Sequence, residues 1–394
     1  MSIKARREYL IAIRERYKKS SKKEKGLILD EFCSVCGYDR NYAIRILGSL
    51  QLPRRLKPGR KPIYGPEVTR HLIALWKLTG MICSKNLKAA IPDWIGFYAK
   101  EHALSERTKK LLLQMSAATM DRHLRPEKVR YPKRISTTSS GPGNWIKNNI
   151  PLKKLDHKVT KPGHVEADTV SHCGDSAVGP FVSSLTITDV YSDWTENRAV
   201  WRKVAENVVD ALKDIDEALP FEMREYTADN GTEVLNKEVK SYLQNRAGHR
   251  VNPKRGRPYK KNDNCFVEQK NWTHVRSIFG YERIDDKIFV PLMNEIYKVY
   301  WGPLKNFFTP TRKMESKRRS GSRVVKQYGQ PKTPYQRLVE SEALSAGQKY
   351  KLRQRKETMN PLYLRRELDR KLASILRLID LEASKKKAIE KSAS

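Results

Sequence analysis

The sequence has few cysteines and no long apolar segment. No stretch approaches the roughly 18 uncharged apolar residues that a membrane-spanning helix needs, so no membrane span is expected. The five cysteines are odd in number and irregularly spaced, which argues against a disulfide framework and is typical of a reducing compartment. The N-terminus is basic but lacks an apolar segment followed by small residues, so no secretory signal is expected either.

Acidic residues are too few to balance the basic ones. Lysine and arginine total 79 against 44 aspartate and glutamate residues, which gives a net charge of +35. Such a charge favours a polyanionic partner, and nucleic acid is the first candidate. A ribosomal or merely basic protein is the alternative. An anionic membrane fits less well, because the basic residues are spread over the whole chain instead of lying on one amphipathic helix. The compact one-chain layout and the reduced cysteines suit a bacterial cytoplasm, and a DNA partner would make the protein nucleoid-associated, with no small-molecule substrate.

Cys33 and Cys36 have the spacing of a pair of zinc ligands. No second pair of cysteine or histidine residues follows at a matching interval, and both cysteines lie within an apolar helical pattern. Packing inside a helical core is therefore expected here, and metal binding is not.

Residues 1–52 have the outline of a helix-turn-helix. Apolar residues recur at helical spacing, Gly37 interrupts them, and Asp39 is a suitable N-cap for a short basic helix over 40–47. A plain helical bundle is the alternative. In the DNA-binding interpretation, the residues facing DNA are Arg40, Asn41, Tyr42 and Arg45.

Residues 53–65 form a basic segment in which prolines and a glycine oppose regular structure. Such a segment can lie in a narrow minor groove or serve as a solvated linker, and one segment can do both. Its candidate DNA contacts are Arg54, Arg55, Arg60 and Lys61.

Residues 66–134 are predicted to be helical again and to form a second DNA-binding region. Ser116 is a candidate N-cap for a last short helix that carries Thr119, Arg122 and His123. Arg122 is the candidate DNA contact. Residues 135–160 are expected to be a linker.

Residues 161–310 change to an α/β pattern with a mixed sheet. Thr232 is a candidate cap for the helix that follows the fourth strand. The predicted order is strands over 164–170, 181–190 and 194–201, a helix over 204–219, a strand over 223–227, and two further helices.

Residues 311–394 form a basic C-terminal region. The segment 310–350 is expected to be irregular, and a helix is expected over 362–381. The apolar stripe on that helix is typical of docking or dimerisation. Its members are Leu364, Leu368, Leu372, Ile375 and Ile379.

Three carboxylates within 161–310 indicate metal chemistry. Asp168 and Asp229 stand at the ends of predicted strands, and Glu268 lies one turn inside a helix. Gathered at one point they would repel one another, and their pKa values would rise unless cations neutralised them. Mg²⁺ prefers such oxygen ligands, and two ions can assist phosphoryl displacement. The sequence therefore predicts two Mg²⁺, with Mn²⁺ as a substitute.

Three motifs resemble the catalytic core of bacterial insertion-sequence transposases and retroviral integrases, which has a ribonuclease-H-like fold. HVEADTV resembles the first-strand motif with Asp168, and YTADNGTE resembles the fourth-strand motif with Asp229. KKNDNCFVEQKN resembles the helix motif with Glu268. Between the last two carboxylates lie 38 residues, slightly more than the family's usual spacing, and the excess falls in a basic loop. The three motifs in order are more specific than any one alone.

The resemblance implies a DDE transposase that binds transposon ends, cuts a strand and joins the freed 3′-OH to target DNA. Double-stranded DNA and further copies of the same chain are the implied partners. Two alternatives remain open: a catalytically silent, domesticated DNA-binding regulator, and a plain nuclease or ribonuclease H. The intact triad argues against the first, and the added helical regions argue against the second.

Several residues near the triad are weaker candidates for a role in the site. Glu166 shares a strand face with Asp168, while Asp189 ends the second strand and is expected to be structural. His164 and His172 are expected to be packed or exposed strand residues instead of ligands. Further candidate DNA contacts are Arg257 and Lys260 in the basic loop, and Asn264 and Asn271 on the helical face of Glu268.

Overall fold

The computed structural model of the chain describes residues 1–49, 63–131, 159–229, 231–246, 248–256, 264–320 and 323–393. These residues form two compact units, Met1–Ile63 and Tyr64–Ser394. Within the described ranges, no helix is both long and apolar enough to cross a membrane. Several predicted DNA contacts lie outside the described residues: Arg54, Arg55, Arg60, Lys61, Arg257 and Lys260.

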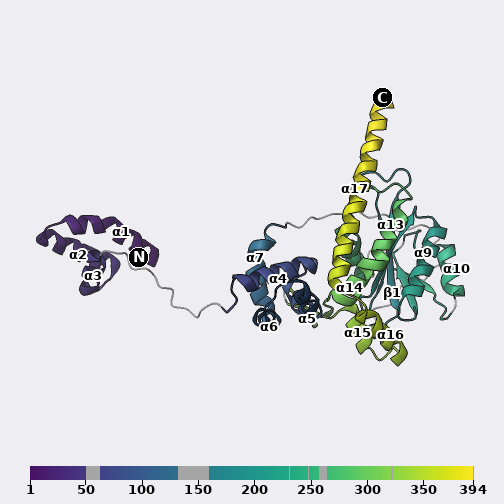
Figure 1. Cartoon of the computed structure of the whole chain (residues 1–394), viewed down its shortest axis with the longest axis horizontal. Helices are drawn as coiled ribbons and strands as arrows, with labels where there is room; N and C mark the ends of the chain where they lie inside the picture. Colours follow the sequence, from purple (N-terminus) through teal and green to yellow (C-terminus); the bar gives the residue numbers. More distant parts are fainter. Residues whose placement is uncertain are drawn as a thin grey trace. The chain divides into compact units, whose positions relative to one another are not determined.

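The first unit is a bundle of the helices α1 (Ile3–Lys19), α2 (Lys22–Cys36) and α3 (Arg40–Gly48) (Figure 1). Gly37 ends α2 with φ of 65°, a backbone conformation that favours glycine. Asp39 then caps α3, because its side chain accepts hydrogen bonds from the backbone N–H groups of Asn41 and Tyr42. Cys36 is 1% exposed in the apolar core of this bundle, as a packing role predicts.

Four helices begin the second unit: α4 (Pro66–Leu78), α5 (Ser84–Glu101), α6 (Glu106–Gln114) and α7 (Ala117–Lys128). Ser116 caps α7, as predicted. The buried indole of Trp94 on α5 donates a hydrogen bond to the Phe308 carbonyl, 3.1 Å away, and Lys356 pairs with Asp93 at 2.9 Å. These helices therefore pack in the same compact unit as the sheet.

A five-stranded mixed sheet lies at the centre of this unit, in the order β3-β2-β1-β4-β5. Strand β1 is antiparallel to β2 and parallel to β4, while β4 is parallel to β5. This order agrees with the expected α/β layout with a mixed sheet. The bounds are β1 His164–Ser171, β2 Val182–Asp189, β3 Thr195–Trp201, β4 Glu225–Ala228 and β5 Pro253–Arg255.

Helices cover the sheet, and Figure 1 shows β1 between α9 and α10 on one side and α13 and α14 on the other. The predicted cap Thr232 is wrong, because the side chain of Asn236 accepts from Val239 N and caps α10. The bounds are α9 Ala205–Ala218, α10 Lys237–Asn245, α11 Cys265–Lys270, α12 Ser277–Phe279, α13 Phe289–Glu295 and α14 Gly302–Phe308, with π-helical segments η1 Asn271–Arg276 and η2 Ile296–Trp301.

The C-terminal region is more regular than predicted. The segment expected to be irregular forms a two-stranded hairpin, β6 (Met314–Ser320) and β7 (Arg323–Tyr328). Two helices follow it, α15 (Pro334–Glu340) and α16 (Ala346–Glu357). The two strands were not predicted, because their basic sequence lacks the apolar alternation from which strands are recognised.

Helix α17 (Pro361–Ala393) carries the predicted apolar stripe. Leu364, Leu368, Ile375 and Ile379 are all buried in the apolar core that this helix shares with the sheet and α14. Of the two expected uses of the stripe, docking and dimerisation, these four residues serve docking onto their own chain.

Candidate active site

Two parallel strands place two of the predicted carboxylates at neighbouring positions of the sheet. Strands β1 and β4 are in register, with Ala167 opposite Ala228. Asp168 and Asp229 are the residues that directly follow these partners. The carboxyl-terminal side of adjacent parallel strands is a common place for functional side chains in α/β proteins. Asp229 is exposed, whereas Asp168 is half-buried.

The helix that carries Glu268 is fixed to β1 at its first turn. The backbone N–H groups of Phe266 and Val267 donate to one carboxyl oxygen of Glu166, at 3.0 and 3.3 Å. Glu166 is fully buried on β1. A carboxyl group at this position satisfies free N–H groups of α11 and suits the positive end of the helix. Glu166 therefore acts as an anchor for α11.

Two asparagines place the Glu268 face of the helix against β1. Asn264 donates to the Ala167 carbonyl at 3.3 Å, and Asn271 donates to the Asp168 carboxylate at 2.6 Å. They stand four residues before and three residues after Glu268, which puts all three on one helical face. Glu268 is exposed. The three predicted carboxylates thus lie on β1, directly after β4 and on α11, and both β4 and α11 contact β1.

The local charges show why Asp168 is sensitive to its neighbours. Burial raises the pKa of Asp168 to about 6, the carboxylates of Asp229 and Glu233 also raise it, and hydrogen bonds from Asn271 and from Thr169 N oppose the rise. A second carboxylate this close favours the neutral form of the first. A bound cation would reverse that preference.

Glu233 is a neighbour of the site whose place the sequence did not reveal. It accepts from the Thr169 hydroxyl at 2.9 Å and pairs with Lys203 at 2.6 Å. Burial opposes ionisation, but Lys203 outweighs it and holds the pKa of Glu233 below its ordinary value. Glu233 is the last residue of the YTADNGTE motif, but the motif does not indicate that this side chain lies beside β1.

The chemistry of the donor set suits a divalent cation. Asp168, Asp229 and Glu268 offer carboxylate oxygens, which Mg²⁺ and Mn²⁺ prefer. The buried amide oxygens of Asn264 and Asn271 have no hydrogen-bond partner among the described residues, and both flank Glu268. Over the same residues, however, no group of three or more His, Cys, Asp or Glu side chains is close enough together to hold an ion. The residues fit the ion by type, and a bound ion would have to draw them closer.

The neighbouring candidates have structural roles. Asp189 is 1% exposed, and its carboxylate accepts from Gly163 N, Ser192 N and the Ser192 hydroxyl, which ties the β2–β3 turn to the start of β1. His172 is fully buried beside Ser184, and burial lowers its pKa to about 3. The expected structural role of Asp189 and the packed position of His172 are thus confirmed.

The described candidate DNA contacts are at the surface of their helices. Arg40, Asn41 and Arg45 are exposed on α3, and Arg122 is exposed on α7. The Arg45 guanidinium lies over the Tyr42 ring at 5.1 Å, while Arg40 is paired with Asp30. A guanidinium on an aromatic ring is held in place and still presents its N–H groups outward.

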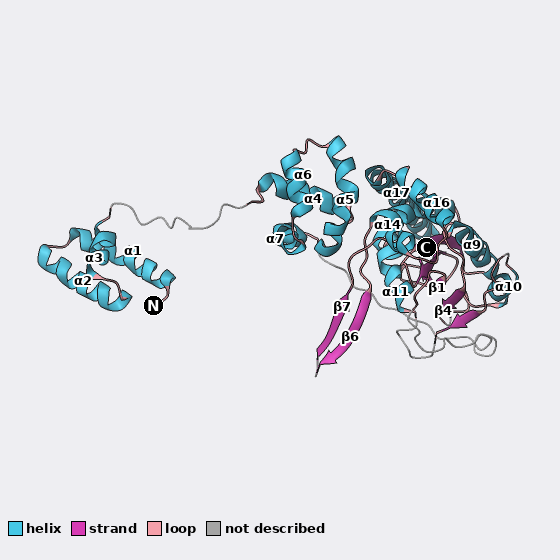
Figure 2. Ribbon diagram, turned by 90° about the horizontal axis from the view of Figure 1, so that it is seen from below, coloured by secondary structure: helices cyan, strands magenta, loops and turns pink. Residues whose placement is uncertain are grey.

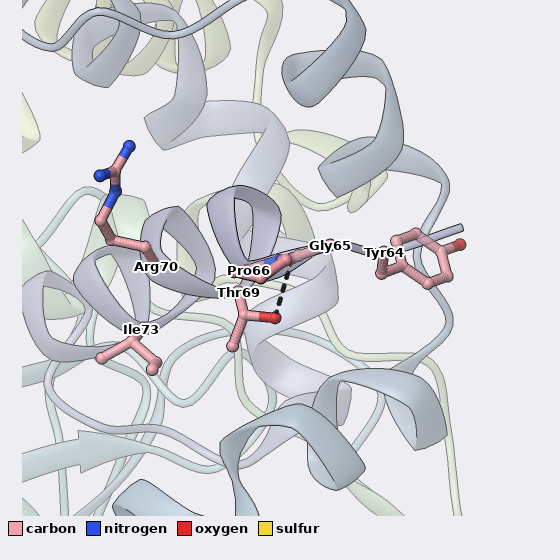
Figure 3. Close-up of a pocket in the computed structure, with 6 residues that line it drawn as sticks. All are labelled: Tyr64, Gly65, Pro66, Thr69, Arg70 and Ile73. Carbon is pink, nitrogen blue, oxygen red and sulfur yellow. Dashed lines mark hydrogen bonds between the residues drawn. The ribbon is translucent and has the colours of Figure 1, made fainter. Parts of the chain in front are cut away.

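A surface pocket lies apart from the carboxylates, at the start of α4 (Figure 3). Thr69 holds this turn through a hydrogen bond from its hydroxyl to the Gly65 carbonyl, 3.2 Å away. The same hydroxyl bonds to His123 of α7 at 2.8 Å, so the pocket borders the α4–α7 contact. Its lining contains Tyr64, Gly65, Pro66, Thr69, Arg70 and Ile73, none of which is a carboxylate.

Glu166 offers a direct test of how α11 is held. Glu166→Ala is expected to lower the free energy of unfolding by about 2–3 kcal/mol, because two buried N–H groups lose a charged acceptor. Glu166→Gln keeps an oxygen that can accept, so its loss should be smaller. Urea unfolding measures both, with the exposed Glu238→Ala on α10 as control. Equal stability of Glu166→Ala and the control would show that α11 is held by other contacts.

Comparison with known proteins gives one close relative in sequence. No protein-family model matches the chain. The uncharacterized protein y4rM of Sinorhizobium fredii is 34% identical over 342 residues, which cover 86% of this chain and 96% of that protein. A chain of the simian T-cell lymphotropic virus intasome, solved by cryo-EM in complex with PP2A regulatory subunit B56 gamma, matches with a TM-score of 0.27 and 12% identity. That match covers 47% of this chain and 59% of the viral chain. It supports no conclusion about the fold or the function of this chain.

Proposed function

The chain belongs to one family with the uncharacterized protein y4rM of Sinorhizobium fredii, and we propose that it is a DNA transposase with a DDE triad. In this proposal the chain binds transposon ends and catalyses metal-dependent strand cleavage and strand transfer. Asp168, Asp229 and Glu268 are the proposed catalytic residues and metal ligands. DNA in its double-stranded form is the proposed partner, as both transposon end and target.

One observation carries the proposal. The register of β1 with β4 puts Asp168 and Asp229 at neighbouring positions, and Asn264 and Asn271 hold the Glu268 face of α11 against β1. The three motifs, which are distant in sequence, therefore lie on neighbouring elements, and this supports the proposal. A net charge of +35 supports a nucleic acid as the molecule acted on.

The three carboxylates would hold two Mg²⁺ or Mn²⁺ ions. When bound, such ions supply Lewis acidity toward phosphate oxygens. The chain's own residues do the rest: Glu166 fixes the helix of Glu268, Asn271 orients the Asp168 carboxylate, and Lys203 neutralises Glu233 beside them. Each of these contacts preorganises the site before DNA arrives.

The exposed faces of two helices are the proposed readers of the DNA. Arg40, Asn41 and Arg45 on α3 and Arg122 on α7 are placed for contact with a duplex. Joining two DNA ends calls for more than one copy of the chain, so a homo-oligomer is part of the proposal.

A silent DNA-binding regulator is the second candidate. It is favoured by one observation: within the described ranges, the acidic side chains do not form a group of three close enough to hold an ion. A protein of this kind would bind the same DNA without any strand chemistry.

The test is a strand-cleavage and strand-transfer assay on duplexes that carry the DNA flanking the protein's own gene. Wild-type protein is expected to cut and join these duplexes with Mg²⁺ or Mn²⁺ and to do neither in EDTA, because the carboxylates cannot act without cations. DNA binding is measured in the same buffers. Tight binding with no cutting under either metal would reject the enzyme in favour of the regulator.

A further inference from the structure

The β6–β7 hairpin carries a dense basic charge that the triad does not account for. Over Met314–Tyr328 the sequence has five basic residues and one acidic residue, Glu315. The basic residues are Lys317, Arg318, Arg319, Arg323 and Lys326. Figure 2 shows the two strands projecting from the body of their unit as an isolated ribbon.

The strand register places one pair of basic residues opposite each other. Lys317 stands directly opposite Lys326, and Arg318 stands opposite Val325. Like charges opposite each other on neighbouring strands destabilise a hairpin. An isolated two-stranded hairpin is itself only marginally stable in water. A polyanion between or along the strands would remove the repulsion.

The described side chains of the ribbon are open to a partner. Arg318 and Lys326 are exposed, and Val325 is 58% exposed. The sequence between the strands is polar, Ser-Gly-Ser. Charge and polarity together favour a hydrophilic polyanion over a membrane.

The root of the ribbon is fixed to the sheet. Lys313, just before β6, donates to the Tyr191 carbonyl at 2.7 Å in the β2–β3 turn. The Thr311 hydroxyl donates to the Asp193 carboxylate at 2.7 Å. Arg337 reaches the same carboxylate at 3.3 Å and the Thr311 carbonyl at 2.6 Å. The ribbon therefore leaves the core from a buried, charged anchor.

The same root also touches the helix of Glu268. The Lys313 ammonium lies 5.2 Å from the centre of the Phe266 ring, and Phe266 is two residues before Glu268 on α11. The root of the ribbon is thus in contact with the helix that carries Glu268. A duplex held along the ribbon would be held in a set relation to the carboxylates.

We infer that the β6–β7 hairpin is a DNA-binding ribbon that lies along a groove of the duplex on which the carboxylates act. The major groove of B-form DNA is about 12 Å wide and admits a two-stranded ribbon. The exposed basic residues contact phosphates, which gives affinity without sequence preference. The choice of duplex DNA as the occupant rests on the proposed function.

The experiment compares the full-length Arg318→Ala/Lys326→Ala double variant with wild type. Fluorescence anisotropy measures binding to a labelled duplex of arbitrary sequence in EDTA, over a series of salt concentrations. The matched control is Lys351→Ala/Arg353→Ala, which removes the same charge from exposed positions on α16. The ribbon variant is expected to bind about tenfold more weakly, and its slope of log K against log salt should fall by about 1–2.

Each outcome decides the inference. Unchanged affinity and slope in the ribbon variant, or an equal loss in the control, would overturn it and leave the charges as protection against edge-to-edge aggregation. Stronger competition by duplex RNA or an acidic polypeptide than by unlabelled DNA would overturn the choice of occupant. Thermal unfolding shows that the variant is folded. The metal-dependent strand-cleavage assay is a separate measurement. If wild-type protein cuts no DNA but the ribbon variant still loses affinity and salt slope, the proposed enzyme is rejected and the DNA-binding ribbon is retained.

Discussion

Glu268→Gln, Asp168→Asn and Asp229→Asn are each expected to reduce metal-dependent strand cleavage about a thousandfold or more, which corresponds to about 4 kcal/mol of transition-state stabilisation. Each substitution keeps the shape of the side chain and removes one negative charge. DNA affinity should change by no more than about twofold, because loss of a carboxylate does not remove a phosphate contact.

The controls for this series are Asp210→Asn and Glu217→Gln, which make the same chemical changes at exposed positions of α9. Cleavage rates under single-turnover conditions, with Mg²⁺ and with Mn²⁺, give the comparison. Full activity in any one triad variant would remove that carboxylate from the proposed ligand set. Loss of activity in the controls as well would mean that total charge, and not the site, governs the rate.

Asp193→Ala is expected to cost about 3–5 kcal/mol of unfolding free energy, the largest effect on stability that we predict. Asp193 is 8% exposed at a turn with φ of 66°. Burial alone would raise its pKa, but the charges of Lys270, Lys313 and Arg337 outweigh burial and hold the pKa of Asp193 below its ordinary value. Without Asp193, these buried cations would lose the acidic partner that they share.

The measurement for Asp193 is urea unfolding at several pH values. Because the folded-state pKa is lowered, the stabilisation is complete above the unfolded-state pKa of about 4 and is lost as the pH falls through the folded value. The difference between wild type and Asp193→Ala should therefore shrink in acid. The exposed Asp210→Ala serves as control. A loss below about 1 kcal/mol would show that the cations are stabilised by their backbone contacts alone.

The α/β core was the most predictable part of the fold. The bounds of the first three strands were predicted to within a few residues, helped by the alternation in β1 and by apolar residues such as Leu185 in β2. Asp168 and Asp229 were recognised because each belongs to a specific motif, Asp168 within a predicted strand and Asp229 just after one. Local pattern was sufficient where one face or both faces of a strand are buried.

The remaining features depend on contacts between distant residues. From the sequence, Glu166 is a strand residue on the face of Asp168, and its hydrogen bonds to α11 are evident only in the folded chain. Glu233 accepts a hydrogen bond from Thr169 only because β1 pairs with β4. The β6–β7 hairpin has too few apolar residues to show a strand period. Asn236 competes with Thr232 for the cap of α10, and sequence alone does not rank two suitable cap residues.

The hydrogen bond from Trp94 to the Phe308 carbonyl has a consequence for DNA geometry. It joins α5, which packs against α7, to α14, which packs against β3 of the central sheet. If α7 reads base pairs as proposed, the protein fixes the distance between those base pairs and the scissile phosphate. The molecule would then select DNA by the spacing between these two points. An extra base pair between the bases read by α7 and the cut would rotate the phosphate backbone away from the carboxylates, so spacing would be recognised as strictly as sequence.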